Sequence, residues 1–515
     1  MPSMSYEPLS PAAFLLRAGH VYAERIAVVD GETRYTYRQF LDRALRLAGA
    51  LRALGVHDGA RVAVLAPNTH VLLEAHYGVP FAGAVLVALN PRLTPADLAG
   101  IVEHAGAAVL IYDCELEATA QEIERKTGAG LTLVRSGGED QYEALLAGAE
   151  PYRCALEDER GLLAINYTSG TTGTPKGVMY HHRGAYLQAL AMALHMRLDA
   201  ASVFLWTLPM FHCNGWCFTW AVTAAGATHV CLRKLEPAAV WQHLRHSGIT
   251  HFNAAPTVLI MLAWHEAAAA PDRAIRIATG GAPPTPALLA RLSALGMDVT
   301  HLYGLTETFG PAVICEWSPE RNADTTEAQA RFKARQGVGN VVSQQLRIVD
   351  ARGEDVAPDG ATLGELALRG NNVMLGYYRD PDATRNAAPD GWLRTGDLAV
   401  MHPDGYVEIR DRAKDIIISG GENIASIEVE RALSTHEAVL EVAVVATPDE
   451  KWGEVPVAFV TIKPDCAVTE DALIAHARAA LAHFKAPRRI VFGELPRNAT
   501  GKIQKFVLRE RARNL

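Results

Sequence analysis

The chain has 515 residues, more than the roughly 250 to 300 at which a single hydrophobic core stops growing, so we expect at least two domains. Its 49% hydrophobic and 21% charged residues are typical of an ordinary globular protein. Lys and Arg number 49 against 57 Asp and Glu, and the resulting formal charge of -8 argues against a general nucleic-acid binder.

The N-terminus and the cysteines favour a cytoplasmic location. The first twenty residues lack a basic segment followed by a long apolar core, and no later run approaches the roughly 18 apolar residues that span a bilayer. The seven cysteines are scattered without CxxC pairs, as expected in a reducing compartment. Cys213 and Cys217 lie near His212, but we interpret them as pocket or core residues rather than zinc ligands. The neighbouring His, Cys and Asn of FHCNG are not interpreted as a catalytic triad, because triad members are rarely adjacent in sequence.

The first strong pattern is helical. Phe40, Ala44, Leu47, Leu51 and Leu54 recur at helical spacing before Gly55, which predicts an amphipathic helix ended by a glycine.

Short apolar runs of strand length then alternate with helix-like segments. These runs occupy residues 61–67, 83–91, 107–113, 162–170, 203–209, 228–233, 249–256, 276–281 and 299–307. Because they are apolar throughout, without strict alternation, they predict strands that are covered on both faces. Such strands are typical of mostly parallel sheets flanked by helices, the α/β class.

Four polar motifs begin where predicted strands end. They are YTSGTTG at 167–173, PMFHCNGW at 209–216, GGAPP at 280–284 and YGLTET at 303–308. In open α/β sheets the ligand crevice lies at the carboxyl ends of the strands, so the four motifs are expected to converge on one site.

The sequence pattern changes from about Leu346, where long apolar runs give way to short strands and turns. Short strands and tight turns at 346–350, 364–370, 391–397 and 405–411 predict a small β subdomain over about 340–411. A further α/β pattern follows, with strand-like runs at 441–449 and 456–462, a helical run at 470–484 and the loop PRNATGK at 496–502. This last part is long enough for a small separate α+β domain.

The stretch YTSGTTGTPKG at 167–177 has the composition of a phosphate-binding loop. Gly170 and Gly173 allow the backbone N–H groups to line an anion site, while the surrounding hydroxyls and Lys176 add donors and a charge. The spacing is not that of a Walker A loop, because Pro175 and Gly177 stand where glycine and Ser or Thr are required. A solvated linker is the alternative, but a linker does not need to follow a buried strand.

Three further motifs carry residues suited to a nucleotide. Glu307 is a candidate Mg²⁺ ligand, Thr306 a donor to phosphate and Tyr303 a flat face for a purine. Asp397 in TGD is suited to accept from two ribose hydroxyls, and Arg412 to pair with the ribose or a phosphate. Each signal is weak by itself, because strand ends and turns use the same residue types.

In this order the motifs resemble those of the adenylate-forming superfamily, which includes acyl-CoA synthetases, aryl-CoA ligases, nonribosomal peptide adenylation domains and firefly luciferase. The resemblance covers essentially the whole chain, from TYRQFLDRA to the terminal GKIQK. It implies an N-terminal adenylation domain over 1–411, a hinge at 412–414 centred on Lys414, and a mobile C-terminal domain over 415–515. It also implies a reaction in two steps. A carboxylate first attacks the α-phosphorus of ATP to give acyl-AMP and pyrophosphate, and a thiol then attacks the acyl carbonyl after the small domain has rotated.

The resemblance also implies roles for individual residues. Catalysis is expected from Lys502, Glu307, Thr168 and His212, with Thr168 and Glu307 at Mg²⁺. Contacts with ATP or coenzyme A are expected from Thr168, Ser169, Gly170, Thr171, Thr172, Gly173, Lys176, Gly281, Ala282, Tyr303, Gly304, Thr306, Asp397, Ile409, Arg412, Ser419, Gly420, Gly421 and Trp452. Phe484 aligns with a second aromatic position beside coenzyme A, while Ala486 stands where some relatives carry arginine.

The acid pocket is expected to be built by His212, Asn214, Gly215, Trp216 and Gly280. Aromatic residues in such a run are as often core residues as substrate walls, and for Trp216 we weigh the two interpretations evenly. Three segments are most similar in sequence to plant acyl-activating enzymes and bacterial medium-chain or methylmercaptopropionate CoA ligases. They are FHCNGWCF, KARQGV at 333–338 and ISGGENIASIEVE at 418–430. This similarity favours a short or medium-chain aliphatic acid, plain or substituted.

The sequence therefore predicts an AMP-forming acyl-CoA synthetase that uses ATP, Mg²⁺ and coenzyme A. An aryl acid, a carrier-protein thiol as acceptor, and a nucleotide- or acyl-binding protein without turnover are the alternatives. Lys176, Glu307, Asp397 and Lys502 are all present, which argues against the last of these. The expected partner is a small carboxylic acid, without nucleic acid or a membrane span, and a homodimer is left open.

Overall fold

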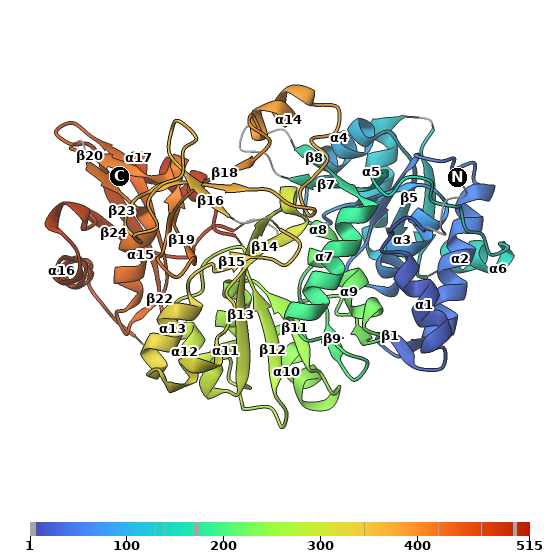
Figure 1. Cartoon of the computed structure of the whole chain (residues 1–515), viewed down its shortest axis with the longest axis horizontal. Coiled ribbons are helices and arrows are strands. Elements are labelled where there is room, and N and C mark those ends of the chain that lie inside the picture. The colour runs from blue at the N-terminus through green and yellow to red at the C-terminus, as the bar shows by residue number, and fades with distance from the viewer. Residues whose placement is uncertain are drawn as a thin grey trace, which may run out of the picture.

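Two large sheets form the body of the molecule (Figure 1). The computed structural model describes residues 7–128, 130–138, 140–168, 175–343, 346–420, 422–464, 466–497 and 502–515. Within these residues, one sheet has the order β15-β14-β13-β12-β11-β9-β10-β1-β2 and the other has the order β6-β5-β3-β4-β7-β8. The strands are β1 Ile26–Asp30, β2 Thr33–Thr36, β3 Arg61–Leu65, β4 Val85–Ala88, β5 Ala107–Asp113, β6 Thr132–Ser136, β7 Leu162–Thr168, β8 Lys176–His181, β9 Val203–Leu205, β10 Thr228–Val230, β11 His251–Ala254, β12 Ile275–Thr279, β13 Met297–Leu305, β14 Gly310–Ile314 and β15 Val338–Gly339.

The pairing in both sheets is mostly parallel. The strands β3, β4, β5, β6 and β7 run parallel to their neighbours, as do β1, β10, β9, β11, β12 and β13. Antiparallel pairs occur towards the edges, where β2, β8, β14 and β15 each pair with the strand that precedes them in the chain. Each of the apolar runs predicted as strands is a strand in the structure. The fold-class prediction is confirmed, although β8, which begins at Lys176 within the predicted phosphate loop, was not among the predicted strands.

Helices fill the space between the sheets and cover their outer faces. They are α1 Ala13–Val21, α2 Tyr37–Ala53, α3 His70–Phe81, α4 Pro95–Ala105, α5 Glu117–Thr127, α6 Gln141–Gly148, α7 His182–His195, α8 Cys213–Trp216, α9 Phe218–Ala224, α10 Pro237–His246, α11 Pro256–Ala263, α12 Pro286–Ala294 and α13 Thr326–Lys333. Val62 of β3 and Phe204 of β9 belong to one core together with residues of α2, α3, α7 and α9, whereas Ala63 packs with α4 and α5 on the opposite face. On the far side of the other sheet, Ile277 packs with residues of α10, α11 and α12. The body is therefore layered helix, sheet, helix, sheet, helix.

Helix α2 follows the predicted amphipathic pattern. Thr36 caps its first turn by accepting from the Gln39 backbone N–H at 3.3 Å, and the Gln39 side chain accepts in return from the Thr36 N–H at 2.9 Å. Gly55 follows the last turn with a φ of +84°, a value that a residue with a side chain rarely adopts. The predicted helix and its end before Gly55 are confirmed.

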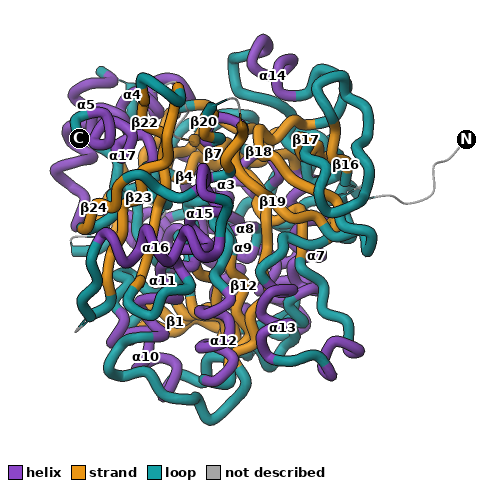
Figure 2. The backbone as a smooth tube through the Cα atoms, turned by 90° about the vertical axis from the view of Figure 1, so that its left-hand side faces the viewer, coloured by secondary structure: helices purple, strands orange, loops and turns teal. Residues whose placement is uncertain are grey.

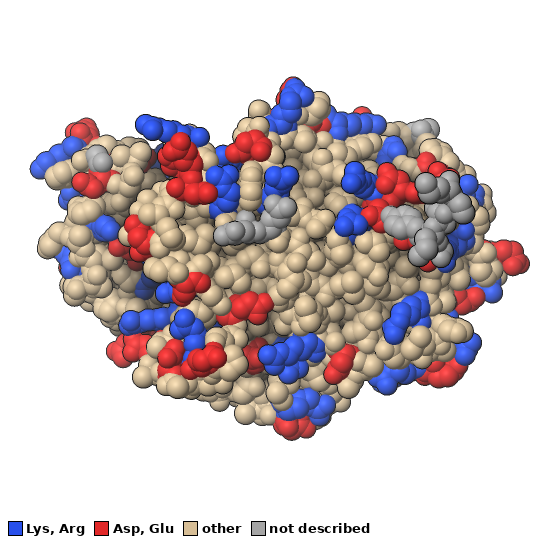
Figure 3. All heavy atoms as spheres, in the orientation of Figure 1, with Lys and Arg blue, Asp and Glu red and all other residues tan. Residues whose placement is uncertain are grey.

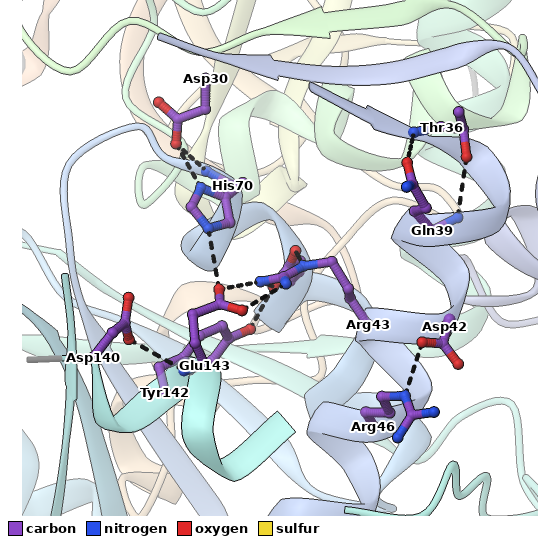
Figure 4. Close-up of polar contacts among 11 residues, drawn as sticks. Asp30, Thr36, Gln39, Asp42, Arg43, Arg46, His70, Asp140, Tyr142 and Glu143 are labelled. Atoms are coloured by element: carbon purple, nitrogen blue, oxygen red, sulfur yellow. Dashed lines mark hydrogen bonds and ion pairs between the residues drawn. The ribbon is translucent and has the colours of Figure 1, made fainter. Parts of the chain in front are cut away.

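A charged network ties α2 to its neighbours (Figure 4). Arg43 of α2 donates to Glu74 of α3 at 2.5 Å and to both carboxylate oxygens of Glu143 in α6 at 2.5 and 2.8 Å. At the start of α3, His70 donates to Asp30 of β1 through its backbone N–H at 2.9 Å and is bonded to the same oxygen through Nδ1 at 2.7 Å. Charges that are largely removed from water thus find partners on four different elements.

Two smaller sheets follow in the C-terminal part of the chain. An antiparallel sheet in the order β16-β17-β18-β19 is formed by β16 Arg347–Val349, β17 Gly364–Leu368, β18 Leu393–Met401 and β19 Val407–Arg412, with α14 Pro381–Ala387 between β17 and β18. The last sheet consists of β20 Ile417–Ser419, β21 Glu422–Ile424, β22 Val439–Asp449, β23 Gly453–Ile462 and β24 Arg489–Phe492.

Three helices, α15 Ser426–Ser434, α16 Glu470–Ala480 and α17 Lys505–Arg513, cover this last sheet. Val429 of α15 and Leu473 of α16 pack on one face with Val444, while Leu508 of α17 packs on the other with Val445. Figure 2 shows α15 and α16 lying side by side over β22 and β23. Among the described residues, no helix combines the length and the apolar character needed to cross a membrane.

Candidate active site

The end of β13 forms one side of the site. Tyr303, Gly304 and Leu305 close this strand, and the short 3-10 helix Thr306–Thr308 turns the chain back into β14. A Cβ built on Gly304 would lie 1.9 Å from the carbonyl oxygen of Gly310, so the two strands can approach this closely only with glycine at position 304.

Asp397 is held between two partners from different elements. The Tyr303 hydroxyl donates to Asp397 Oδ2 at 2.5 Å, and Arg412 Nε lies 3.1 Å from Asp397 Oδ1. Asp397 and Arg412 also face each other as neighbours on β18 and β19. The structure therefore brings together three residues predicted to contact the nucleotide, and the carboxylate is oriented by a phenol on one side and a guanidinium on the other.

Lys502 reaches the same place from the C-terminal part of the chain. Its Cε would lie 3.3 Å from a Cβ built on Gly281, the loop glycine that follows β12. Burial lowers the pKa of Lys502, and the nearby positive charge of Arg412 lowers it further, while Asp397 and Glu307 act in the opposite direction. The ammonium is thus placed at the strand ends at an unfavourable cost in hydration, which an anionic ligand would offset.

His212 precedes a strained turn beside this lysine. Burial of its ring, followed by the charge of Lys502, lowers the pKa of His212 from 6.5 to about 4, so the imidazole is neutral at physiological pH. The next five residues, 213–217, all have positive φ angles between 51° and 64°, although one alone is a glycine. Left-handed conformations of this kind cost roughly 1–2 kcal/mol for each residue that has a side chain. Strain of this size is typical of functional sites, where the surrounding structure enforces it.

Trp216 lies between Gly280, a predicted pocket residue, and Gly310, which the sequence did not single out. Its Cη2 would be 3.3 Å from a Cβ on Gly280, and its Cα would be 3.1 Å from a Cβ on Gly310. The residue is 6% exposed and belongs to the core between the sheets. Gly215 packs against Trp206, since its Cβ would be 2.5 Å from the indole of that residue. Trp216 can therefore be both a core residue and part of the pocket wall, because it packs in the core and presents the edge of its ring to the loop after β12.

Asn214 is completely buried in the same turn. Its side-chain oxygen and nitrogen have no hydrogen-bond partner within the described part of the chain. The buried imidazole of His76 in α3 lies near enough to interact with this amide, and burial lowers the pKa of His76 to about 4. The turn thus keeps an unsatisfied amide next to a neutral imidazole.

A tyrosine that the sequence did not single out connects two predicted residues. The Tyr377 hydroxyl donates to Glu307 Oε1 at 2.8 Å, and Lys176 Nζ lies 4.9 Å from the centre of the Tyr377 ring. Lys176 opens β8, where it pairs with Thr168 at the end of β7. Tyr377 therefore fixes the Glu307 carboxylate beside the strands that flank the phosphate loop.

Several predicted site residues lie outside the strand-end cluster, by which we mean Lys176, His212, Tyr303, Glu307, Asp397, Arg412 and Lys502. Ile409 is 6% exposed and belongs to the core of the β16–β19 sheet, and Ala282 lies exposed in the loop after β12. Ser419 and Gly420 lie at the end of β20, where Trp452 packs at 2.8 Å from a Cβ built on Gly420. Figure 1 shows β20 at the outer left of the molecule, away from β13 and β14. The remaining predicted residues, Ser169, Gly170, Thr171, Thr172, Gly173 and Gly421, lie outside the described residues.

Comparison with known proteins decides the family. The family described as AMP-binding enzyme matches residues 15–378, and the family described as AMP-binding enzyme C-terminal domain matches residues 428–502. The chain belongs to the AMP-binding enzyme family. The resemblance seen in the motifs is thereby confirmed.

Curated relatives of this AMP-binding enzyme match it over almost its entire length. An acetate–CoA ligase of Humulus lupulus is 42% identical, with 99% of this chain and 96% of the relative covered. A peroxisomal acetate/butyrate–CoA ligase of Arabidopsis thaliana is also 42% identical, with the same coverage of 99% and 96%. The predicted enzyme class, a carboxylate–CoA ligase, is confirmed.

Solved structures bear on the arrangement of the C-terminal part. The ATP-bound structure of MatB from Rhodopseudomonas palustris is 26% identical and matches with a TM-score of 0.87 over 97% of this chain and 98% of that one. The apo structure of the same protein matches with a TM-score of 0.78 over 98% and 99%. This AMP-binding enzyme therefore has an overall arrangement closer to that of the ATP-bound relative.

The cysteine alternatives find no support in the AMP-binding enzyme. Burial raises the pKa of the Cys213 thiol to about 11, so the thiolate needed for nucleophilic attack is scarce at neutral pH. Within the described ranges, no group of three or more His, Cys, Asp and Glu side chains is arranged to hold a metal ion.

Other surface features lie apart from the strand-end cluster. A cavity of about 440 Å³ is lined by Asp30, Glu115 and Arg233 among others, and by none of the predicted site residues. On the face drawn in Figure 3, acidic and basic side chains are interspersed around a broad uncharged centre.

Proposed function

We propose that this carboxylate–CoA ligase activates a short or medium-chain aliphatic acid with ATP and transfers the acyl group through acyl-AMP to coenzyme A. The observation that carries the proposal is the buried ammonium of Lys502, which reaches the ends of β12 and β13 beside His212 and Glu307. The names of the relatives, an acetate–CoA ligase and an acetate/butyrate–CoA ligase, support a short aliphatic acid.

The electrostatics of the cluster suit the first half-reaction. A carboxylate that approaches a triphosphate meets like charge, so the reaction needs cations and oriented donors that are fixed in advance. Lys502 supplies a partly buried cation, and it would lie between the acid and the α-phosphate. The neutral imidazole of His212 borders the acid without adding a charge. Asp397, oriented by Tyr303 and Arg412, would accept from the ribose hydroxyls.

The residues present fit a magnesium ion bound mainly by the substrate. Mg²⁺ usually takes one or two protein oxygens together with phosphate oxygens and water, so it does not require a cluster of carboxylates. Glu307 presents one carboxylate, held by the Tyr377 hydroxyl, and Thr168 ends the neighbouring strand β7. When bound, the ion would neutralise phosphate charge and thereby favour loss of pyrophosphate.

The second half-reaction would require the C-terminal part to turn about residues 412–414. Lys414 is exposed in the short 3-10 helix Ala413–Asp415, which follows β19 directly. Rotation there would withdraw Lys502 and bring Ser419, Gly420, Gly421 and Trp452 towards the acyl-AMP to form the pantetheine tunnel. The position of β20 away from the strand ends in Figure 1 agrees with a structure poised for the first half-reaction.

The substrate is tested by measuring AMP release from a panel of acids with ATP and Mg²⁺, each with and without coenzyme A. Acetate, propionate, butyrate, hexanoate, 4-hydroxybutyrate and benzoate cover the aliphatic and aryl alternatives. We expect the highest kcat/KM within the short and medium-chain aliphatic acids and a requirement for coenzyme A. A preference for benzoate would replace the aliphatic proposal by an aryl one. The absence of CoA-dependent AMP with every acid would refute it.

A carrier protein is the competing thiol acceptor. If hydroxylamine traps the acyl-AMP but coenzyme A does not accelerate AMP release, the acceptor is a different thiol, and phosphopantetheinylated carrier protein becomes the next probe. The cytoplasmic location and a homodimer stay predictions.

A further inference from the structure

One ion pair joins the C-terminal part of the chain to the β16–β19 sheet. Arg431 of α15 donates through Nη1 to Oε1 of Glu408 in β19. Arg431 lies within the C-terminal family match, which begins at residue 428, whereas Glu408 lies in β19, before that match begins. The pair therefore links the part of the chain that carries Lys502 to the part that carries Asp397.

The two sides of this pair differ in burial. Glu408 is 9% exposed, and it also receives His402 Nε2 at 3.0 Å and Arg410 Nη2 at 3.2 Å on its second oxygen. The Arg431 side chain is 34% exposed. If the two parts separate, Glu408 keeps its two partners from the same sheet, and Arg431 is already close to water. The pair can thus break without leaving a buried charge unpaired, which is the condition that makes the loss of a buried ion pair expensive.

Other contacts of the C-terminal part reach Asp411 in β19 and Trp264 after α11. The backbone N–H of Ser426 donates to Asp411 Oδ2, next to the proposed hinge at 412–414. At greater separation in sequence, Lys463 Nζ lies 5.9 Å from the centre of the Trp264 ring, which is 42% exposed. A cation near an exposed ring contributes little, and a contact beside the hinge moves little when the chain turns there. The Glu408–Arg431 pair is therefore the better candidate for an orientation-dependent contact.

We propose that Glu408 and Arg431 are a positioning pair for acyl-AMP formation. Bound together, they hold α15 against β19 and so keep Lys502 beside Gly281. Released, they let the C-terminal part turn for thioester formation. The inference rests on the proposed function, because it assumes that the two half-reactions need different orientations.

The test compares two variants that each remove one arginine from Glu408. Arg431→Gln removes the contact between the two parts, and Arg410→Gln, the matched control, removes a contact within the β16–β19 sheet. Each half-reaction is measured separately: pyrophosphate release from butyrate and ATP for the first, and acyl-CoA formation from supplied butyryl-AMP and coenzyme A for the second. For Arg431→Gln we expect acyl-AMP formation to fall about fivefold, in line with a partly exposed ion pair, and thioester formation to stay equal or to rise. For Arg410→Gln we expect the ratio of the two rates to equal that of the wild type.

Limited trypsin digestion supplies a second readout. Arg412 and Lys414 are the cleavage sites in the proposed hinge, and we expect Arg431→Gln to be cut there about fivefold faster than the wild type in the presence of ATP. An equal fall of both half-reactions in Arg431→Gln, or an equal change in Arg410→Gln, would overturn the positioning role. If the wild type makes no acyl-AMP from any acid, the proposed function is refuted. If the wild type catalyses both steps and Arg431→Gln has the same ratio of acyl-AMP formation to thioester formation, this inference alone is refuted.

Discussion

Tyr303 and Asp397 join two sheets through one hydrogen bond of 2.5 Å. Tyr303 lies at the end of β13 in the large sheet, whereas Asp397 lies in β18 of the small antiparallel sheet. Asp397 is 3% exposed, and its other oxygen faces Arg412 at 3.1 Å. The carboxylate proposed for the ribose is therefore oriented before ATP binds, and this orientation depends on the phenol.

Replacing Tyr303 by Phe removes this hydrogen bond but keeps the ring. A hydrogen bond to a charged group contributes about 1.5–3 kcal/mol, so we expect KM for ATP to rise about 10-fold or more, with a smaller change in KM for the acid. Steady-state pyrophosphate release at varied ATP measures the effect. Asp397→Asn should raise KM for ATP at least as much. An unchanged KM for ATP in Tyr303→Phe would show that the phenol does not orient the carboxylate.

Replacing Lys502 by Ala separates the two half-reactions. The buried ammonium would act on the carboxylate and the α-phosphate in the first step, and the loss of one such group typically costs about 2.7–4 kcal/mol, or roughly 100- to 1000-fold in rate. We expect acyl-AMP formation to fall by this factor, while thioester formation from supplied acyl-AMP keeps most of its rate. Equal losses in both steps would contradict the assignment of Lys502 to the first step alone.

The strand-end motifs were predictable because parallel strands place their carboxyl ends along one edge. Tyr303 lies near the end of β13, and Gly281 and His212 follow β12 and β9. The structure brings all three to the same region as Lys502. Only the family resemblance, by contrast, could connect Lys502 with these strands, since more than a hundred residues separate it from them.

Other contacts of the site could not be predicted from sequence. Tyr377 lies 70 positions from Glu307 and is one of two adjacent tyrosines, with no local pattern to mark which of them reaches the carboxylate. The left-handed turn over 213–217 is equally hidden, because Cys and Trp do not favour positive φ by themselves, and Asn adopts it as a single residue rather than in a run. Such conformations are imposed by packing, here against Trp206 and Gly310.

Replacing Lys414 by Pro tests the proposed hinge. Proline is tolerated in the first turn of a helix, where Lys414 now stands, but it fixes φ near -65° and so restricts a rotation there. We expect acyl-AMP formation to remain within about threefold of the wild type and thioester formation to fall at least 100-fold, because the second orientation is no longer accessible. The matched control, Lys414→Ala, removes the side chain without restricting φ and should keep both rates. If Lys414→Pro retains thioester formation, the chain turns at a different residue.

The pH dependence of stability tests the network at the start of α3 (Figure 4). Burial alone would lower the pKa of His70, but its hydrogen bond to Asp30, the Glu143 carboxylate 3.9 Å from its Nε2 and the charge of Glu74 raise it from 6.5 to about 10. The folded protein therefore keeps a proton that the unfolded chain releases above about pH 6.5. This contribution to stability is fully present below pH 6.5 and is lost as the pH rises through about 10.

We expect the melting temperature of the wild type to fall between pH 7 and 10 more steeply than that of His70→Gln, which has no proton to lose. The variant should be less stable at pH 7 and approach the wild type at pH 10. Parallel curves for the two proteins would mean that His70 is not held in its charged form by Asp30 and Glu143.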